Sequence, residues 1–118
     1  MTNPLKGEVE LVVGTGSDAQ RFKLVADINA FCEAEEATGL DMSQLLSKIF
    51  GSSSIRIMRG VLWAFLQRNH AADVPHLAAA GEIMAEAGVP EVTKAVLAAL
   101  TAALPAKKEG AEAGDSRP

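Results

Sequence analysis

The sequence predicts an α+β fold that is mainly α: an N-terminal β-hairpin followed by a bundle of four or five short helices. Two observations predict it. Apolar and polar side chains alternate within the first 25 residues, whereas from Asp27 onward apolar side chains recur at helical spacing. Residues that commonly cap helices stand at Asp27, Ser54 and Asp73. A chain of 118 residues is expected to form one domain, which we place at 1–104, followed by a disordered tail at 105–118.

The first predicted element is a hairpin whose strands cover 7–13 and 20–25. The segment between them, 14–18, contains two glycines, a serine and an aspartate, which supply the backbone geometry and hydrogen bonds of a turn. An isolated hairpin is only marginally stable in water, so its apolar face must pack on the helices or on another sheet. The residues expected on that face are Val9, Leu11, Val13, Phe22 and Leu24.

Two short helices are expected next. Asp27 should cap the first helix, and Gly39 should end it. The second helix should begin at either Asp41 or Ser43 and end at Gly51. The core-facing residues are expected to be Ile28, Phe31, Cys32 and Glu35 in the first helix, and Leu45, Leu46 and Ile49 in the second.

The third and fourth helices carry longer apolar stripes. Ser54 is the expected cap of the third helix and Asp73 that of the fourth. Pro75 fits the first turn of the fourth helix, and Gly88 should end that helix. Trp63 lies about 100° round the third helix from the neighbouring stripe residue, so we expect a boundary position, partly covered by the hairpin or the last helix. The stripes are Met58, Val61, Leu62, Phe65 and Leu66, and then Leu77, Ala80, Ile83, Met84 and Ala87.

The last helix, 89–104, is apolar on nearly every side and has Pro90 in its first turn. Such a helix must be covered, so it is either the central helix of the bundle or a docking surface for another chain. The side expected to face the core consists of Val92, Val96, Ala99, Leu100 and Ala103. The side left for a partner consists of Ala95, Leu97, Ala98, Ala102 and Leu104.

Composition argues against several classes of protein. The net charge is −4, which does not provide the basic surface that nucleic acids require. A single cysteine fits a reducing compartment, and no apolar run is long enough to span a membrane. These features predict a cytoplasmic protein with neither nucleic acid nor a membrane as its partner.

Motifs for catalysis, metals or cofactors are also missing from the sequence, so we expect no enzymatic activity and no cofactor. The glycine-rich segment 14–17 is expected to join two strands, whereas a phosphate-binding loop joins a strand to a helix. His70 and His76 lack the further ligands of a zinc site. Cys32 is expected to be a buried structural residue.

An acidic run, Glu33, Glu35 and Glu36, lies on the first predicted helix. Charge runs of this kind are mostly solvated faces. The run could also face a basic partner. A third interpretation is pairing within the fold with the basic side chains of the third helix, Arg56, Arg59 and Arg68.

Several motifs, in their order and spacing over residues 3–105, carry a resemblance to a known family. The motifs are Asn-Pro-Leu-Lys-Gly-Glu-Val at 3–9, Asn-Ala-Phe-Cys-Glu-Ala-Glu at 29–35, Arg-x-x-Leu-Trp-Ala-Phe-Leu at 59–66, Ala-Gly-Glu-Ile-Met-Ala-Glu-Ala-Gly at 80–88, and the apolar helix ending at Leu104. With these motifs the chain is similar to the small protein of gene-transfer-agent and related siphophage tail clusters, a family labelled both tail tube protein and tail assembly chaperone. Phe31 stands where leucine is expected in that family, and the loop after Gly14 is longer.

The resemblance implies a chaperone that binds the tape measure protein and recruits tail tube protein in the bacterial producing cell. Because the client is helical, docking of a helix into a groove is the expected mode. A structural tail tube-associated protein is one alternative, although a tube subunit needs more strands than one hairpin. A small helical DNA-binding regulator is another, which the net charge opposes.

A second copy of the chain could use the same partner surface, giving a homo-oligomer. The partner-binding residues expected are Ala95, Leu97, Ala98, Ala102 and Leu104 of the last helix and Glu33, Glu35 and Glu36 of the first.

Overall fold

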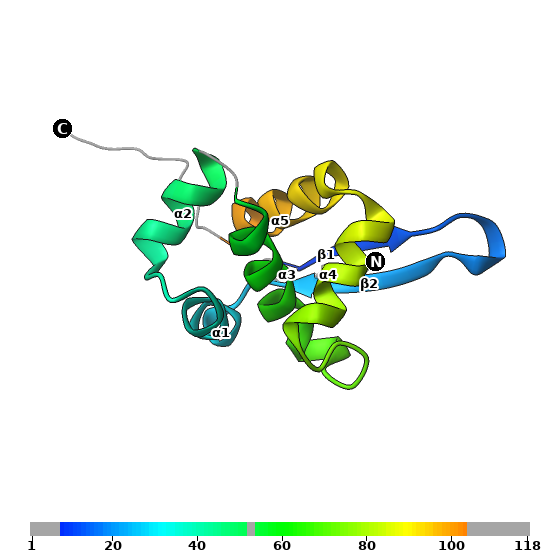
Figure 1. Ribbon diagram of the computed structural model, residues 1–118, viewed down its shortest axis with the longest axis horizontal. Coiled ribbons are helices and arrows are strands. Elements are labelled where there is room, and N and C mark those ends of the chain that lie inside the picture. The colour runs from blue at the N-terminus through cyan, green and yellow to red at the C-terminus, as the bar shows by residue number, and fades with distance from the viewer. Residues whose placement is uncertain (1–7, 52–53, 104–118) are drawn as a thin grey trace.

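An antiparallel β-hairpin followed by five α-helices makes up the computed structural model, which describes residues 8–51 and 54–103 (Figure 1). This arrangement confirms the predicted fold class. The predicted tail and Leu104 lie outside the described residues. The elements are β1 (Glu8–Val13), a short 3₁₀ turn (Gly16–Asp18), β2 (Gln20–Val25), α1 (Ile28–Thr38), α2 (Met42–Phe50), α3 (Ile55–His70), α4 (Leu77–Ala87) and α5 (Val89–Ala103).

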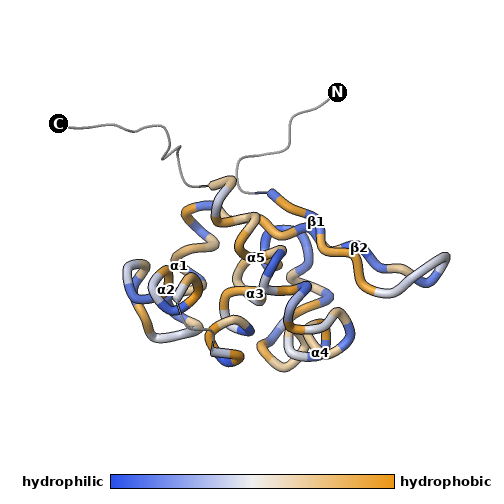
Figure 2. The backbone as a smooth tube through the Cα atoms, turned by 90° about the horizontal axis from the view of Figure 1, so that it is seen from above, coloured by the Kyte–Doolittle hydropathy of each residue, from blue (hydrophilic) through white to orange (hydrophobic). Residues whose placement is uncertain are grey.

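The hairpin pairs its strands in the register that places Leu11 opposite Phe22. Both side chains are buried, as predicted, because this face packs on the helices. The opposite face carries an ion pair between Arg21 and Glu10, whose side-chain nitrogen and oxygen lie 3.0 Å apart. The turn end of the hairpin extends beyond the helices in both views (Figures 1 and 2).

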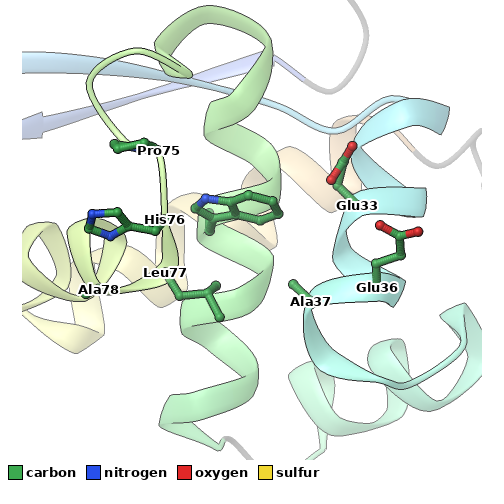
Figure 3. A pocket seen from close by; sticks show the side chains of 8 residues that line it. Glu33, Glu36, Ala37, Pro75, His76, Leu77 and Ala78 are labelled. Atoms are coloured by element: carbon green, nitrogen blue, oxygen red, sulfur yellow. The ribbon is translucent and has the colours of Figure 1, made fainter.

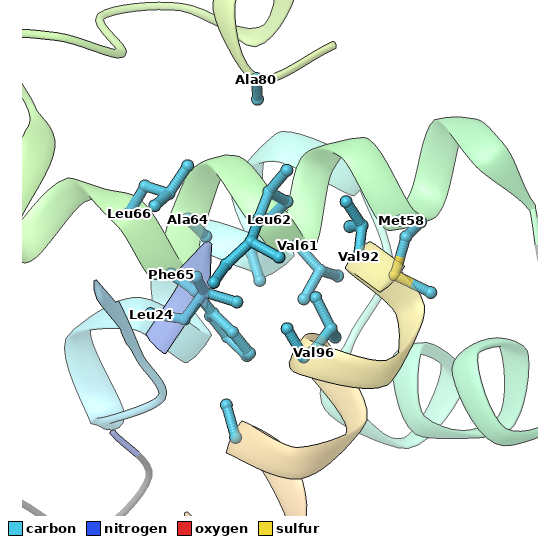
Figure 4. Close-up of a cluster of buried hydrophobic side chains, with 14 of the residues drawn as sticks. Leu24, Met58, Val61, Leu62, Ala64, Phe65, Leu66, Ala80, Val92 and Val96 are labelled. Carbon is cyan, nitrogen blue, oxygen red and sulfur yellow. The ribbon is translucent and has the colours of Figure 1, made fainter. Parts of the chain in front are cut away.

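Helix α3 is the centre of the fold, since it contacts β2 and all four other helices. Its predicted stripe is buried throughout, and Gly60 and Ala64 on an adjoining side are buried as well. Figure 4 shows side chains of α3 meeting Leu24 of β2 and Val92 and Val96 of α5. The last helix is therefore one wall of the core, and α3 is the central helix.

Helix α1 packs on α3 through small residues, and this corrects the predicted face. Ala30 and Ala34 are buried, whereas Ile28 is 73% exposed and Cys32 is also exposed. The reason is a close approach of the two backbones: a Cβ added at Gly60 would lie only 2.7 Å from Cγ2 of Thr38. At that separation a side chain as large as that of Ile28 cannot fit between the helices, so Ile28 and Cys32 face outward. Phe31 is half-buried and packs on the core as predicted, with 6.2 Å between its ring centroid and that of Phe65.

The predicted helix starts are confirmed for α1 and α3, and of the two alternatives for α2, Asp41 and Ser43, the structure has Asp41. Asp27, Asp41 and Ser54 each accept a hydrogen bond from a backbone N–H in the first turn of the helix that they cap. Among the helices of the described residues, none is both long enough and apolar enough to cross a membrane.

The predicted cap of α4 was wrong. This helix begins at Leu77, with His76 rather than Asp73 at the N-cap position. The cause is Val74, which is fully buried and whose carbonyl oxygen accepts a hydrogen bond from Nε2 of Gln67 at 2.9 Å. A residue that precedes a proline also favours extended backbone over helix. The chain therefore enters the core at Val74 before the helix can start.

Helix α5 is covered on two sides. Val92, Val96, Ala99 and Leu100 are buried as predicted, and Ala103 is half-buried. The prediction that Ala95 faces a partner was wrong: it is only 8% exposed. The expectation missed strand β1, which packs along this side of α5. Leu97 is half-buried against the core, so Ala98 and Ala102 are the predicted partner residues of α5 that the structure leaves exposed.

Candidate functional site

A groove of about 610 Å³ runs between α1 and the start of α4, over one side of α3. Figure 3 shows Glu33, Glu36 and Ala37 on the side of α1, facing Pro75, His76 and Leu77 across the groove. We call this surface the Trp63 groove. Its lining residues are Glu33, Glu36, Ala37, Trp63, Pro75, His76, Leu77 and Ala78.

Trp63 contributes the aromatic surface of the groove. Its side chain is half-buried, which confirms the predicted boundary position. The predicted cover was wrong, because the neighbours in the groove come from α1 and residues 75–78, not from the hairpin or α5. The indole Nε1 is shielded from solvent and has no hydrogen-bond partner among the described residues. Tryptophan combines a large apolar surface with one polar donor, which suits it to binding other proteins.

The acidic run of α1 divides into two parts. Glu33 and Glu36 line the groove, and neither forms an ion pair within the part of the chain that the structure describes. Glu35 points elsewhere: its Oε2 accepts a hydrogen bond from the backbone N–H of Met42, 2.9 Å away, at the start of α2. Glu35 therefore joins two helices, while its neighbours present carboxylates to the groove.

The basic side chains of α3 do not neutralise these carboxylates. Arg68 bonds Asp27 instead, with 2.8 Å between Nη1 and Oδ2. Arg56 and Arg59 line a smaller neighbouring hollow. The interpretation in which the acidic run pairs with all three arginines within the fold is therefore not what the described residues show.

A second hollow, of about 330 Å³, is lined by residues of β1 and α5. Ala95 and Ala98 both line it, together with Lys94 and Glu91 of the same helix. Leu97 and Ala102 do not, so the predicted partner residues of α5 are not gathered on one hollowed surface.

The remaining sequence candidates have local roles. His70 accepts a hydrogen bond from the hairpin, and its ring packs edge-on against Phe22 with 5.3 Å between ring centroids. His76 is exposed at the groove. Cys32 was expected to be buried and is exposed instead, because α1 turns that side outward. Within residues 8–51 and 54–103, no group of three or more His, Cys, Asp or Glu side chains could hold a metal ion.

No family model, curated protein or solved structure matches this chain. The groove and the sequence motifs are therefore the features of this chain that bear on its function. Sequence reasoning identified the acidic run but missed the groove that two of its carboxylates line. One signal was present: Trp63 stands off the apolar stripe of its own helix, so only part of its ring could be expected to pack on the core.

Proposed function

We propose that this protein is an assembly chaperone for phage-like tails, of a gene transfer agent or a siphophage, and that it acts in the cytoplasm of the producing bacterium. In this role it binds a helical segment of the tape measure protein in the Trp63 groove and helps to recruit tail tube subunits. The tail-assembly role follows from the resemblance of the sequence motifs. The observation that supports the binding site is the groove, which a half-buried indole lines together with two carboxylates that have no ion-pair partners among the described residues.

An amphipathic client helix suits this surface. Its apolar side would cover Trp63, Ala37 and Leu77, and its Lys or Arg side chains would meet Glu33 and Glu36 at the rim. Burying an indole in this way is a common source of binding energy at interfaces. Such a role requires binding and no catalysis.

The two alternatives draw less support from the fold. A ring-forming tube subunit needs an extended β-sandwich, and the described residues contain two strands. In a DNA-binding regulator with a helix-turn-helix at Gly51, α3 would have to enter the major groove. Helix α3 instead lies at the centre of the domain, in contact with β2 and all four other helices.

Two matched variants test the site. Ala78→Arg and Ala98→Arg place the same side chain at exposed alanines, the first in the Trp63 groove and the second in the hollow between β1 and α5. Each is co-expressed with the tape measure protein, and the soluble fraction of the client is measured. We expect Ala78→Arg to lose the soluble client and Ala98→Arg to retain it, with both variants melting cooperatively by circular dichroism.

The reverse result would place the client on α5 beside β1. Retention of the client by both variants would overturn the groove as the binding site. If the unaltered protein does not keep the tape measure protein soluble, the chaperone function itself is wrong.

A further inference from the structure

The Trp63 groove does not end at Ala37. A neighbouring hollow of about 180 Å³ shares Ala37 and Leu77 with it, so the two hollows adjoin along α3, and we call them together the trough. The floor of the trough follows one side of α3, where Arg56, Arg59 and Trp63 stand at helical spacing. The neighbouring hollow is lined by Ala37, Thr38, Arg56, Ile57, Arg59 and Leu77.

The two ends of the trough carry opposite charges. Glu33 and Glu36 lie at one end, and Arg56 and Arg59 lie at the other. None of the four forms an ion pair within residues 8–51 and 54–103. In addition, Nε of Arg59 is shielded from solvent and has no hydrogen-bond partner among those residues. The two sets of charges therefore have no partner in each other or in the other described residues.

The length of the trough suits a helix. Arg56 and Trp63 on its floor are roughly two turns apart, or about 10 Å along α3 at the usual helical rise, and Glu33 and Glu36 line the hollow at the Trp63 end. A helix lying along the trough presents side chains of one face at three- and four-residue spacing, so charges two turns apart fall on the same side.

We propose that the trough recognises a charge pattern: a helix that carries Lys or Arg at one end of its apolar face and Asp or Glu about two turns away. The basic side chains pair with Glu33 and Glu36, the acidic ones pair with Arg56 and Arg59, and the apolar residues between them cover Trp63. This inference deepens the proposed function, because it specifies which client segment fits and in which register.

Trp63 supplies the measurement, since it is the one tryptophan in the chain. The probe is a synthetic helical peptide without tryptophan or tyrosine, with two lysines and two glutamates separated by about two turns on its apolar face. Titrated into the full-length protein, it should shift the Trp63 emission saturably, with an affinity that falls as salt is added. A peptide with glutamate in place of both lysines, and one with glutamine at all four positions, should each bind at least about tenfold more weakly.

Variants of the protein give the matched test. E33Q/E36Q should weaken binding of the charged peptide by about tenfold, and R56Q should weaken it in the same direction, while the glutamine peptide binds all the variants alike. Glu36→Lys should recover affinity for the peptide whose lysines are replaced by glutamate. Equal binding of all the peptides, or no effect of E33Q/E36Q, would overturn the proposal.

Two further results separate the proposals. If the Trp63 emission depends on protein concentration without peptide, a second copy of the chain occupies the trough and this inference fails. If the tape measure protein stays soluble with E33Q/E36Q and R56Q as well as with the unaltered protein, the charge pattern is wrong but the chaperone function stands. If the protein binds the peptide but does not bind the tape measure protein, the charge pattern is right and the chaperone function is wrong.

Discussion

His70, the last residue of α3, accepts a hydrogen bond at Nε2 from the backbone N–H of Lys23, with 2.9 Å between the two nitrogens. Lys23 lies in β2, so a side chain of the central helix satisfies a donor on the edge of the hairpin. The histidine ring also packs against Phe22, the neighbouring strand residue. One side chain therefore fastens the hairpin to the helices by two interactions.

Replacing His70 should loosen this attachment. His70→Phe keeps an aromatic ring near Phe22 but removes the acceptor, so Lys23 loses its partner and unfolding should become easier by about 1 kcal/mol. His70→Gln retains an acceptor and should be less destabilised. Urea denaturation of the three proteins measures the difference, and equal stability of the Phe variant and the unaltered protein would show that water replaces the bond.

Gly60 should not tolerate a methyl group while Thr38 is present. In Gly60→Ala the new Cβ would meet Cγ2 of Thr38, which cannot easily rotate because Oγ1 donates to the carbonyl oxygen of Ala34 at 2.7 Å. We expect a loss of about 1–3 kcal/mol, although alanine favours helix over glycine.

The double variant Gly60→Ala/Thr38→Ser provides the control. Serine keeps the hydroxyl and lacks the methyl, so the double variant should be more stable than Gly60→Ala alone. Thermal melts of the unaltered protein, the two single variants and the double variant form a double-mutant cycle. Additive effects would contradict a direct contact between these two positions.

The outward side of α1 should be insensitive to substitution. Ile28→Ser and Cys32→Ser alter exposed side chains and should change the free energy of unfolding by no more than about 0.5 kcal/mol. Ala34→Val, which adds volume in the seam with α3, should cost about 1–3 kcal/mol. The Cys32 thiol of the native protein should also react fully with a thiol reagent without denaturant. A thiol that is protected from the reagent would instead support the buried position predicted from the sequence.

The size of the Trp63 side chain should contribute more to the stability of the fold than its N–H group does. Trp63→Ala removes a half-buried ring and should cost about 3 kcal/mol or somewhat less. Trp63→Phe also removes the shielded nitrogen that lacks a partner, so much of that loss should be recovered. Chemical denaturation followed by circular dichroism measures both. An alanine variant as stable as the unaltered protein would mean that the ring makes no contribution to the fold.

Local signals in the sequence predicted local structure well. Asp27, Asp41 and Ser54 were identifiable as caps because a cap interacts with the turn that follows it in the chain. The alternating hairpin and the stripe of α3 were predicted for the same reason, since periodicity depends on nearest neighbours along one element.

The errors arose where packing between distant segments decides the outcome. Nothing within α1 itself reveals that Gly60 allows the two helices to approach closely, so Ile28 and Cys32 were assigned inward. Asp73 was taken as a cap because the burial of Val74 is a property of the assembled core. The Trp63 groove was missed for the same reason, because three segments separated in the chain form it.

Small residues form the contact between α1 and α3, namely Ala30 and Ala34 of α1 and Gly60 of α3, and their size affects the energetics of binding. Alanine and glycine have no side-chain rotamers to immobilise, so this seam forms with little loss of side-chain entropy. The wall of the groove that carries Glu33 and Glu36 is consequently held close to its floor, where the side chains of Thr38 and Ala37 pack against the backbone of Gly60. A surface fixed in this way is preorganised, so a ligand does not spend binding energy on ordering it. We therefore expect affinity at this site to depend mainly on the ordering of the partner.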